Sequence, residues 1–261
     1  MNNFLRYFLF LSIILTIFSR CSENSPPYPD PDPEPEVPEE PGDFTITPHD
    51  FLSDEKYDFF VTEVVYVDGY KPDQNSSAGL ISFLDGRIHK SAGIRSYGSV
   101  AIASPGKSSY SIDDLKELEK AYRTKLPSDT LLSAWIFIVD GDFSGNEDDS
   151  KVLGVAYGET SIALFGKTIA DYSGGIDQPS KQVLETTVLQ HEFCHLLGLV
   201  NNGTPMIDNH QDTEHGHHCS NNNCLMYYAA ETNHFLTDFL WGSPPPLKDQ
   251  CLNDLQNNGG K

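Results

Sequence analysis

Five consecutive residues in the last third of the chain carry side chains that could do hydrolytic chemistry: His191, Glu192, Phe193, Cys194 and His195. Two histidines four positions apart lie on the same face of a helix, so both imidazoles can bind one metal ion. Glu192 is rotated by about 100° from His191 around such a helix. It can therefore hold a metal-bound water molecule as a general base without itself being a ligand. The spacing predicts a zinc site with His191 and His195 as ligands and Glu192 as catalytic base. A core helix with two incidental histidines is the alternative.

The residues that follow this motif resemble those of the metzincin metallopeptidases. Gly198 lies three positions after His195, as in that family. The standard metzincin pattern then places a third ligand where this chain has Asn201, whose amide oxygen is a poorer zinc ligand than an imidazole. Further on, the chain resembles the archaemetzincins, with residues 199–217 containing an insertion. The matching residues are His218-Cys219 and, after four residues, Cys224-Leu225-Met226.

This resemblance implies roles for several downstream residues. His218 would be the third ligand of one catalytic Zn²⁺, with His215 and then His210 as alternatives. Met226 would be the methionine of the turn beneath the zinc. Tyr228 would donate to the developing oxyanion, although a tyrosine that merely packs on the core is an alternative. The implied fold is α+β and zincin-like, with a mixed twisted sheet, a long active-site helix and a helical C-terminal part.

The cysteines raise a separate question. Archaemetzincins use cysteines of this segment and a later Cys-x-x-Cys pair for a second, structural zinc, whereas this chain has only Cys251 further on. In an oxidising compartment we therefore expect a disulfide between Cys219 and Cys224, with Cys194 and Cys251 as the leftover pair. The many histidines and acids of residues 208–218 indicate either a solvated polar loop or, as a second possibility, an additional metal site.

The elements that must position these residues are read from apolar patterning. The expected strands span residues 57–67, 98–103, 131–139, 152–157 and Ser161–Phe165. The expected helices span residues 77–88, a segment that begins at Ser111, and residues 183–199 after a start signal at 177–180. Strands that precede the decisive helix favour an α+β domain. By the family resemblance, Ser161–Phe165 would be the edge strand that pairs with an extended substrate.

The N-terminal region has the features of an export signal. Arg6 is the only charge before an apolar run over residues 7–18, and that run forms about 18 Å of helix, too short for the roughly 30 Å hydrocarbon core of a membrane. With Cys21 directly after it, the segment resembles a bacterial lipoprotein signal; a signal peptide cleaved elsewhere is the alternative. The expected organisation is a signal over residues 1–20, an acidic proline-rich tether over 21–43, and one metallopeptidase domain over 44–261.

Composition limits the function further. The formal net charge is -21, from 38 acidic and 17 basic side chains, and this argues against a nucleic-acid binder. Residues 198–206 resemble a segment of bacterial surface lipoprotein metalloproteases. We therefore expect a monomeric zinc endopeptidase that acts on peptides or proteins. It would be anchored by the Cys21 lipid to the outer or cell membrane, at the surface or facing the periplasm. The alternative is a non-catalytic zinc lipoprotein that binds a glycan, a protein or a metal, but such a protein has no need of the base Glu192.

Overall fold

The computed structural model describes residues 45–147, 150–232 and 242–261, and the structural statements below concern these residues. All of these described residues belong to one contact unit. The expected signal peptide, Cys21 and the whole tether lie outside the described residues. Within the described part of the chain, no helix is both long and apolar enough to cross a membrane.

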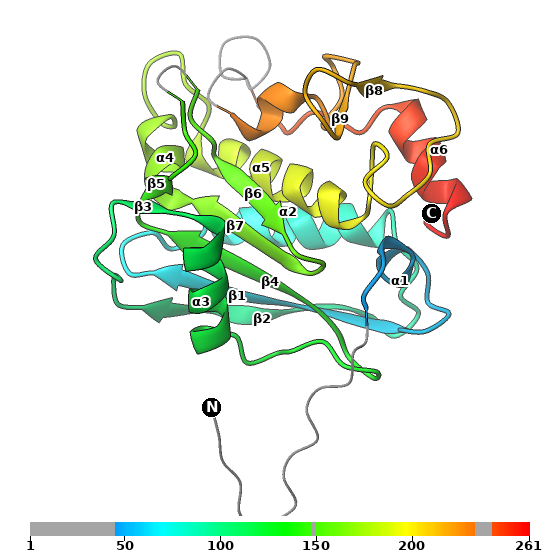
Figure 1. The fold of residues 1–261 in the computed structure, drawn as a ribbon, viewed down its shortest axis with the longest axis horizontal. Coiled ribbons are helices and arrows are strands. Elements are labelled where there is room, and N and C mark those ends of the chain that lie inside the picture. Colours follow the sequence, from blue (N-terminus) through cyan, green and yellow to red (C-terminus); the bar gives the residue numbers. More distant parts are fainter. Residues whose placement is uncertain (1–44, 148–149, 233–241) are drawn as a thin grey trace, which may run out of the picture. The chain divides into compact units, whose positions relative to one another are not determined.

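A five-stranded mixed sheet forms the centre of this unit, in the order β2-β1-β4-β7-β6 (Figure 1). The strands are β1 (Phe59–Val67), β2 (Gly93–Ile102), β4 (Leu132–Val139), β6 (Gly154–Tyr157) and β7 (Ser161–Phe165). The first four in spatial order are parallel, and β6 is antiparallel to β7. Mixed sheet, long helix and helical C-terminal part are as the sequence predicted.

The edge strand, however, differs from the prediction. Ser161–Phe165 is not at the edge, because β7 pairs with β4 on one side and with β6 on the other. A short turn centred on Gly158, with a φ of 63°, folds the chain back so that β6 covers β7 as a hairpin. The exposed edge of the sheet near the histidine motif is therefore β6.

The central strands are buried on both faces, which explains their continuous apolar sequences. Every residue of β4 is buried, and alternate side chains enter different core clusters. Leu132, Ala134, Ile136 and Ile138 belong to one cluster, and Trp135, Phe137 and Val139 belong to the other. The first cluster includes the apolar side chains of α2 (Gln74–Asp85) and α5 (Lys181–Leu196), and the second includes those of α3 (Ile112–Tyr122). Helices thus cover both faces of the sheet (Figure 1).

The remaining elements are short. They are α1 (Pro48–Leu52), α4 (Gly166–Asp171), α6 (Asp249–Asn257), the 3₁₀ helix η1 (Tyr228–Glu231), and the small strand pairs β3 (Ser109–Tyr110) with β5 (Asp142–Phe143) and β8 (Gln211–Asp212) with β9 (His218–Cys219). The α2 helix begins earlier than the sequence suggested, because the Asp73 carboxylate caps it by accepting from the Asn75 N–H.

The α5 helix, which carries the histidine motif, is positioned by strong local signals at both ends. The Ser180 hydroxyl accepts from the Val183 N–H and caps its N-terminus. The helix ends at Leu196, and Gly198, whose φ of 74° is left-handed, turns the chain away just after it. A side chain at Gly198 would also lie 2.7 Å from Pro48, so glycine is required both for the turn and for the close packing of α1. Only a few residues of α5 reach solvent, and the helix is held tightly against the sheet.

Candidate active site

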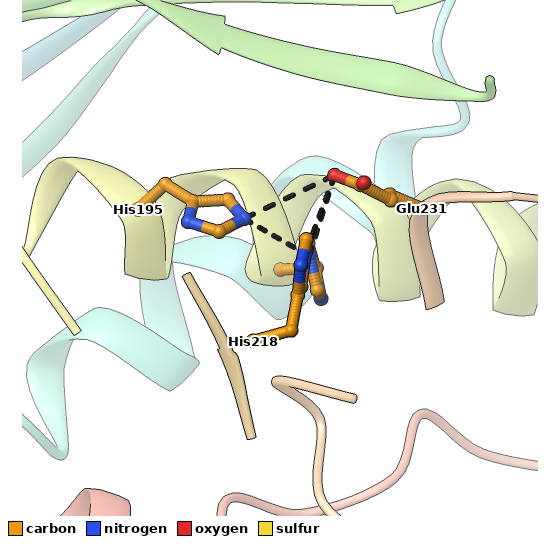
Figure 2. A group of neighbouring side chains, drawn as sticks. His195, His218 and Glu231 are labelled. Carbon is orange, nitrogen blue, oxygen red and sulfur yellow. Dashed lines mark hydrogen bonds and ion pairs between the residues drawn. The ribbon is translucent and has the colours of Figure 1, made fainter. Parts of the chain in front are cut away.

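Three histidines converge at the C-terminal half of α5. His191 and His195 come from α5, and His218 comes from β9. Their ring centroids lie 4.9 to 5.2 Å apart, and the Nε2 atoms of His191 and His195 are 3.1 Å apart. In Figure 2 the side chains of His195 and His218 point toward a common centre. We refer to His191, His195 and His218 as the three-histidine centre.

The backbone fixes which nitrogen of two of these rings faces the centre. His191 Nδ1 lies 2.7 Å from the carbonyl oxygen of Leu225, and His218 Nδ1 lies 2.5 Å from that of His215. A ring N–H at Nδ1 donates to each carbonyl, which leaves the lone pair on Nε2. Both Nε2 lone pairs are therefore directed at the centre, as metal binding requires.

Burial keeps two of the rings neutral. It lowers the pKa of His191 to about 4 and lowers that of His195 well below its usual value. Burial also acts to lower the pKa of His218, but the neighbouring Glu231 carboxylate outweighs it and the pKa is raised. Because neutral imidazole is the form that binds a metal, His191 and His195 are poised as ligands near neutral pH.

Glu192 lies beside the three-histidine centre, bordering the same depression as His195 and His218. The side chain is buried, and neither carboxylate oxygen has a hydrogen-bond partner among the described residues. Burial first, and then the charge of Glu231, raise the pKa of Glu192 well above its usual value, while the nearby Ala156 backbone offsets part of this rise. Since buried polar groups are almost always paired, these oxygens indicate a partner that is bound during function.

The centre opens into a cleft with two adjoining depressions of about 630 and 420 Å³. His215, His218 and Glu231 border both of them. One wall of the smaller depression is the edge strand, through Val155 and Ala156. An extended chain could lie in the cleft between this strand and the insertion.

Gly154 allows the edge strand to come close to Glu192. A Cβ atom at this position would lie 2.5 Å from Val188 Cγ1 and 3.0 Å from Glu192 Cγ. Any larger residue would push β6 away from α5. The glycine thus sets the distance between the general-base candidate and the strand that borders the cleft.

The insertion after Gly198 is folded and not a free loop. Its strand β8 pairs antiparallel with β9, with Gln211 opposite Cys219 and Asp212 opposite His218. This hairpin brings His218 to the centre, although many residues separate it from α5. The amide of Asn201 donates to Gln211 Oε1 at 3.5 Å, and Asn201 borders neither depression of the cleft.

The other candidate residues lie elsewhere around the cleft. The ring of His215 stacks on that of Tyr228 with centroids 3.7 Å apart, and its Nδ1 lies 2.7 Å from an Asp212 carboxylate oxygen. Tyr228 borders the larger depression next to His218. Met226 is fully buried, and its carbonyl accepts from the Cys219 N–H. The methionine segment thus supports the strand that carries His218.

A second group of side chains that could bind a metal comes from the insertion, from β9 and the segment after it, and from α6. His210 Nδ1 is 3.3 Å from Cys219 Sγ and 4.0 Å from Cys251 Sγ, and Cys224 Sγ is 3.6 Å from Cys251 Sγ. His210 Nε2 in turn lies 2.8 Å from an Asp254 carboxylate oxygen, with both side chains almost fully buried. We call His210, Cys219, Cys224 and Cys251 the cysteine–histidine cluster.

This cluster corrects the expected disulfides. Cys194, Cys219, Cys224 and Cys251 are all free thiols, so neither the Cys219–Cys224 bridge nor the Cys194–Cys251 bridge is present. The physical reason is that Cys219 and Cys224 meet two further ligands from distant parts of the chain. The thiols of Cys219 and Cys251 hold the pKa of Cys224 at about 3, which favours the thiolate. A thiolate is the form that binds metals.

Glu231 is a residue of the centre that the sequence analysis missed. Its Oε2 atom lies 3.7 Å from His191 Nε2, 3.9 Å from His195 Nε2 and 3.5 Å from His218 Nε2. These four residues form a group that could hold a metal ion. The only sequence signal was an acid shortly after Met226, which by itself is too common to single out.

A mixed sheet with the paired histidines on a long helix beneath its edge strand defines a zincin-type fold. Among solved structures, this chain resembles archaemetzincin of Methanopyrus kandleri, with 15% identity over 77% of this chain and 96% of that chain and a TM-score of 0.50. Two others are a zinc-dependent peptidase of Methanocorpusculum labreanum (16%, 75% and 99%, TM-score 0.47) and archaemetzincin of Archaeoglobus fulgidus in complex with malonate (12%, 75% and 98%, TM-score 0.41).

The first of these likenesses shows that the chain has the archaemetzincin fold, as the sequence resemblance implied. No family model matches the sequence. No curated protein matches it either.

Proposed function

We propose that this protein is a zinc-dependent endopeptidase of the metzincin type. The observation that carries the proposal is the three-histidine centre beside the unpartnered carboxylate of Glu192, at the edge of an open cleft. Two of the solved structures that resemble this chain are archaemetzincins and a third is a zinc-dependent peptidase, which agrees with this reading.

The residues present fit a zinc ion. Three imidazole nitrogens are a common ligand set for catalytic zinc, and His218 Nε2 is buried without a hydrogen-bond partner among the described residues. Backbone carbonyls hold His191 and His218 in the tautomer that a metal requires. When bound, zinc would polarise the scissile carbonyl and make a water molecule more acidic.

Glu192 would act as the proton carrier. Its carboxylate accepts a proton from the attacking water and returns it to the nitrogen of the leaving amine. Its burial serves this role, because a raised pKa makes the carboxylate a stronger base. Tyr228 borders the same cleft and would donate its phenolic hydrogen to the developing oxyanion.

The substrate would bind as an extended strand along β6. Val155 and Ala156 are only partly buried at this free edge and border the cleft. Backbone hydrogen bonds to an edge strand bind peptides with little dependence on sequence. This predicts an endopeptidase whose selectivity is set by the insertion on the opposite wall.

Glu192→Gln tests the proposal. The variant should keep the zinc content of the wild type and lose roughly 10²–10⁴ in the rate of peptide cleavage, since only the base is removed. Cleavage of a diverse peptide library, with zinc measured on the same samples, is the assay. Undiminished cleavage by the variant would exclude the proposed mechanism.

We also propose that the cysteine–histidine cluster holds a second, structural zinc. In a tetrahedral zinc site with Zn–S near 2.3 Å and Zn–N near 2.05 Å, ligand atoms lie about 3.5–3.8 Å apart. The His210–Cys219, Cys224–Cys251 and His210–Cys251 separations of 3.3, 3.6 and 4.0 Å bracket this range. Of these residues, His210, Cys219 and Cys251 form a group that could hold a metal ion, and Cys224 lies beside Cys251. Asp254 would orient His210 as the carboxylate partner that zinc-bound histidines usually have. This proposal raises the expected count from one catalytic zinc to two ions with different roles.

Attachment to the cell envelope is proposed from the sequence alone. The short apolar run before Cys21 and the acidic tether after it support a lipid on that cysteine, in the outer or cell membrane. Cys21→Ser should abolish incorporation of a labelled fatty acid and release the protein from the membrane fraction. Absence of label in the wild-type protein would refute the anchor.

One observation favours the alternative, a non-catalytic zinc lipoprotein. The Glu231 carboxylate completes a set of four protein ligands, and zinc sites with four protein ligands are generally structural. The pairing of Glu192 with an open cleft favours the enzyme, and the two readings differ in what Glu231 does.

A further inference from the structure

The position of Glu231 is that of a fourth ligand. One oxygen, Oε2, lies 3.5 to 3.9 Å from all three Nε2 atoms of the three-histidine centre. Around tetrahedral zinc, nitrogen and oxygen ligands lie about 3.3 Å apart. Figure 2 shows the carboxylate of Glu231 pointing toward the rings of His195 and His218. A single oxygen held near three nitrogens in this way matches the fourth corner of a tetrahedron.

The backbone of the same segment is tied to the chain that leads into the edge strand. The Glu231 carbonyl accepts from the Leu153 N–H at 2.8 Å, and Thr232 forms an antiparallel bridge with Val152. The Leu153 carbonyl in turn accepts from Phe165 of β7, so these residues continue the line of β6. Residues 231–232 therefore pair with the entrance of the strand that borders the cleft, as part of an extended substrate would.

The Glu231 carboxylate is partly open to solvent and is carried by a short element. The side chain of Glu231 is 26% exposed and borders both depressions of the cleft. It stands on η1, a helix of only four residues, and not on the rigid α5. Glu192, by contrast, keeps both oxygens unpartnered in the position of a base, which a purely structural zinc site would not need.

We propose that Glu231 is a fourth zinc ligand that closes the site in the substrate-free protein and is displaced when a peptide binds. The inference rests on the proposed peptidase function and adds a self-blocking contact to it. A peptide that pairs along β6 would compete with residues 231–232 for the strand entrance. Release of the carboxylate would then open the fourth position of the zinc.

The test compares Glu231→Gln with wild type in the full chain. Zinc affinity is measured by competition with a chelator, and the visible absorption spectrum of the cobalt(II)-substituted protein reports the ligand set. We expect at least about a tenfold loss of zinc affinity, by analogy with removal of groups that support a metal site. We also expect a changed cobalt spectrum and faster cleavage of short peptides. Glu214→Gln, an exposed acid of the insertion, is the matched control and should leave all three unchanged.

Glu231→Asp separates ligation from charge, because it keeps the charge and withdraws the carboxylate by one methylene. A cobalt spectrum changed by both substitutions supports ligation. An unchanged spectrum and affinity in Glu231→Gln overturns the inference, even if the wild type cleaves peptides. An altered spectrum without faster cleavage, in an active wild type, overturns the blocking role. If Glu231→Gln alters the spectrum but neither protein cleaves any peptide, the ligand stands and the peptidase proposal fails.

Discussion

Replacement of Cys251 by serine should remove the proposed structural zinc, while the three-histidine centre stays occupied when zinc is in excess. Cys251 is fully buried on α6, and its Sγ lies 3.6 Å from Cys224 Sγ and 4.0 Å from His210 Nδ1. A hydroxyl is a poor substitute for a thiolate at zinc, while the size of the side chain barely changes. We expect the zinc content of the purified protein to fall from two ions per chain to one.

The expected loss of stability follows from mass action. A ligand present at a thousand times its dissociation constant stabilises the folded state by about 4 kcal/mol. For a domain of this size, 1 kcal/mol corresponds to about 2–4 °C in the midpoint of thermal unfolding. Removal of the bound ion should therefore lower the midpoint by roughly 8–16 °C. Structural zinc in small domains often binds more tightly than this assumes, so the figure is a lower bound.

Cys194→Ser provides the matched control. Cys194 is equally buried, but it belongs to α5 and is not part of the cysteine–histidine cluster. This variant should keep both zinc ions and lose only about 1–2 kcal/mol of stability, from a buried hydroxyl in place of a thiol. Thermal unfolding and metal analysis on the same samples compare the two. An equal zinc content in both variants, or a Cys219–Cys224 disulfide in an unreduced digest of wild type, would refute the structural zinc.

Two further predictions concern the sheet edge and a helix cap. Gly154→Ala should cost about 1–3 kcal/mol by overpacking and slow peptide cleavage by up to about 10²-fold, because the added methyl meets Val188 and shifts Glu192. Gly98→Ala is the control, since a methyl there meets nothing within 4 Å. Wild-type kinetics in Gly154→Ala would contradict the argument. Asp114, whose pKa is lowered to about 2 by Lys107 first and then by the Ser111 cap, is expected to contribute stability above its ordinary pKa of 3.8 that is lost as the pH falls toward 2. The stability gap between wild type and Asp114→Asn should therefore shrink over that window in urea titrations.

The parts of the structure that could be predicted are those encoded locally. Ser180 and Gly198 mark the ends of the active-site helix, and the histidine spacing needs only helical geometry. The limits of β7 were also predicted correctly, because a short run of apolar residues between turns is visible in the sequence. Its place in the sheet was not, since strand order depends on which distant segments pair. The continuous apolar run Ile162–Phe165 is typical of a strand buried on both faces, but it does not identify the strands that pair with it.

The disulfide prediction was wrong because it depended on contacts between distant segments as well. It rested on the number of cysteines and paired Cys219 with Cys224, which are close in sequence. The cluster instead joins Cys219 and Cys224 to His210 and to Cys251 of α6, residues that only the folded insertion and C-terminal helix bring together. His210 could be recognised as a metal-ligand type, but its Asp254 partner lies 44 positions away, too far for spacing to indicate.

The two groups of residues that could hold a metal ion are linked through adjacent residues of the chain. In the two-residue strand β9, His218 and Cys219 are consecutive, and side chains of consecutive strand residues point to opposite faces. One face supplies the three-histidine centre and the other supplies the cysteine–histidine cluster. Cys224 likewise precedes Leu225, whose carbonyl orients His191. His218 is therefore adjacent to Cys219 in the chain, and His191 is hydrogen-bonded to the residue that follows Cys224. A structural ion in the cluster would hold the geometry of the centre, and Cys251→Ser should then also weaken zinc binding at the three histidines, although no residue of that centre is changed.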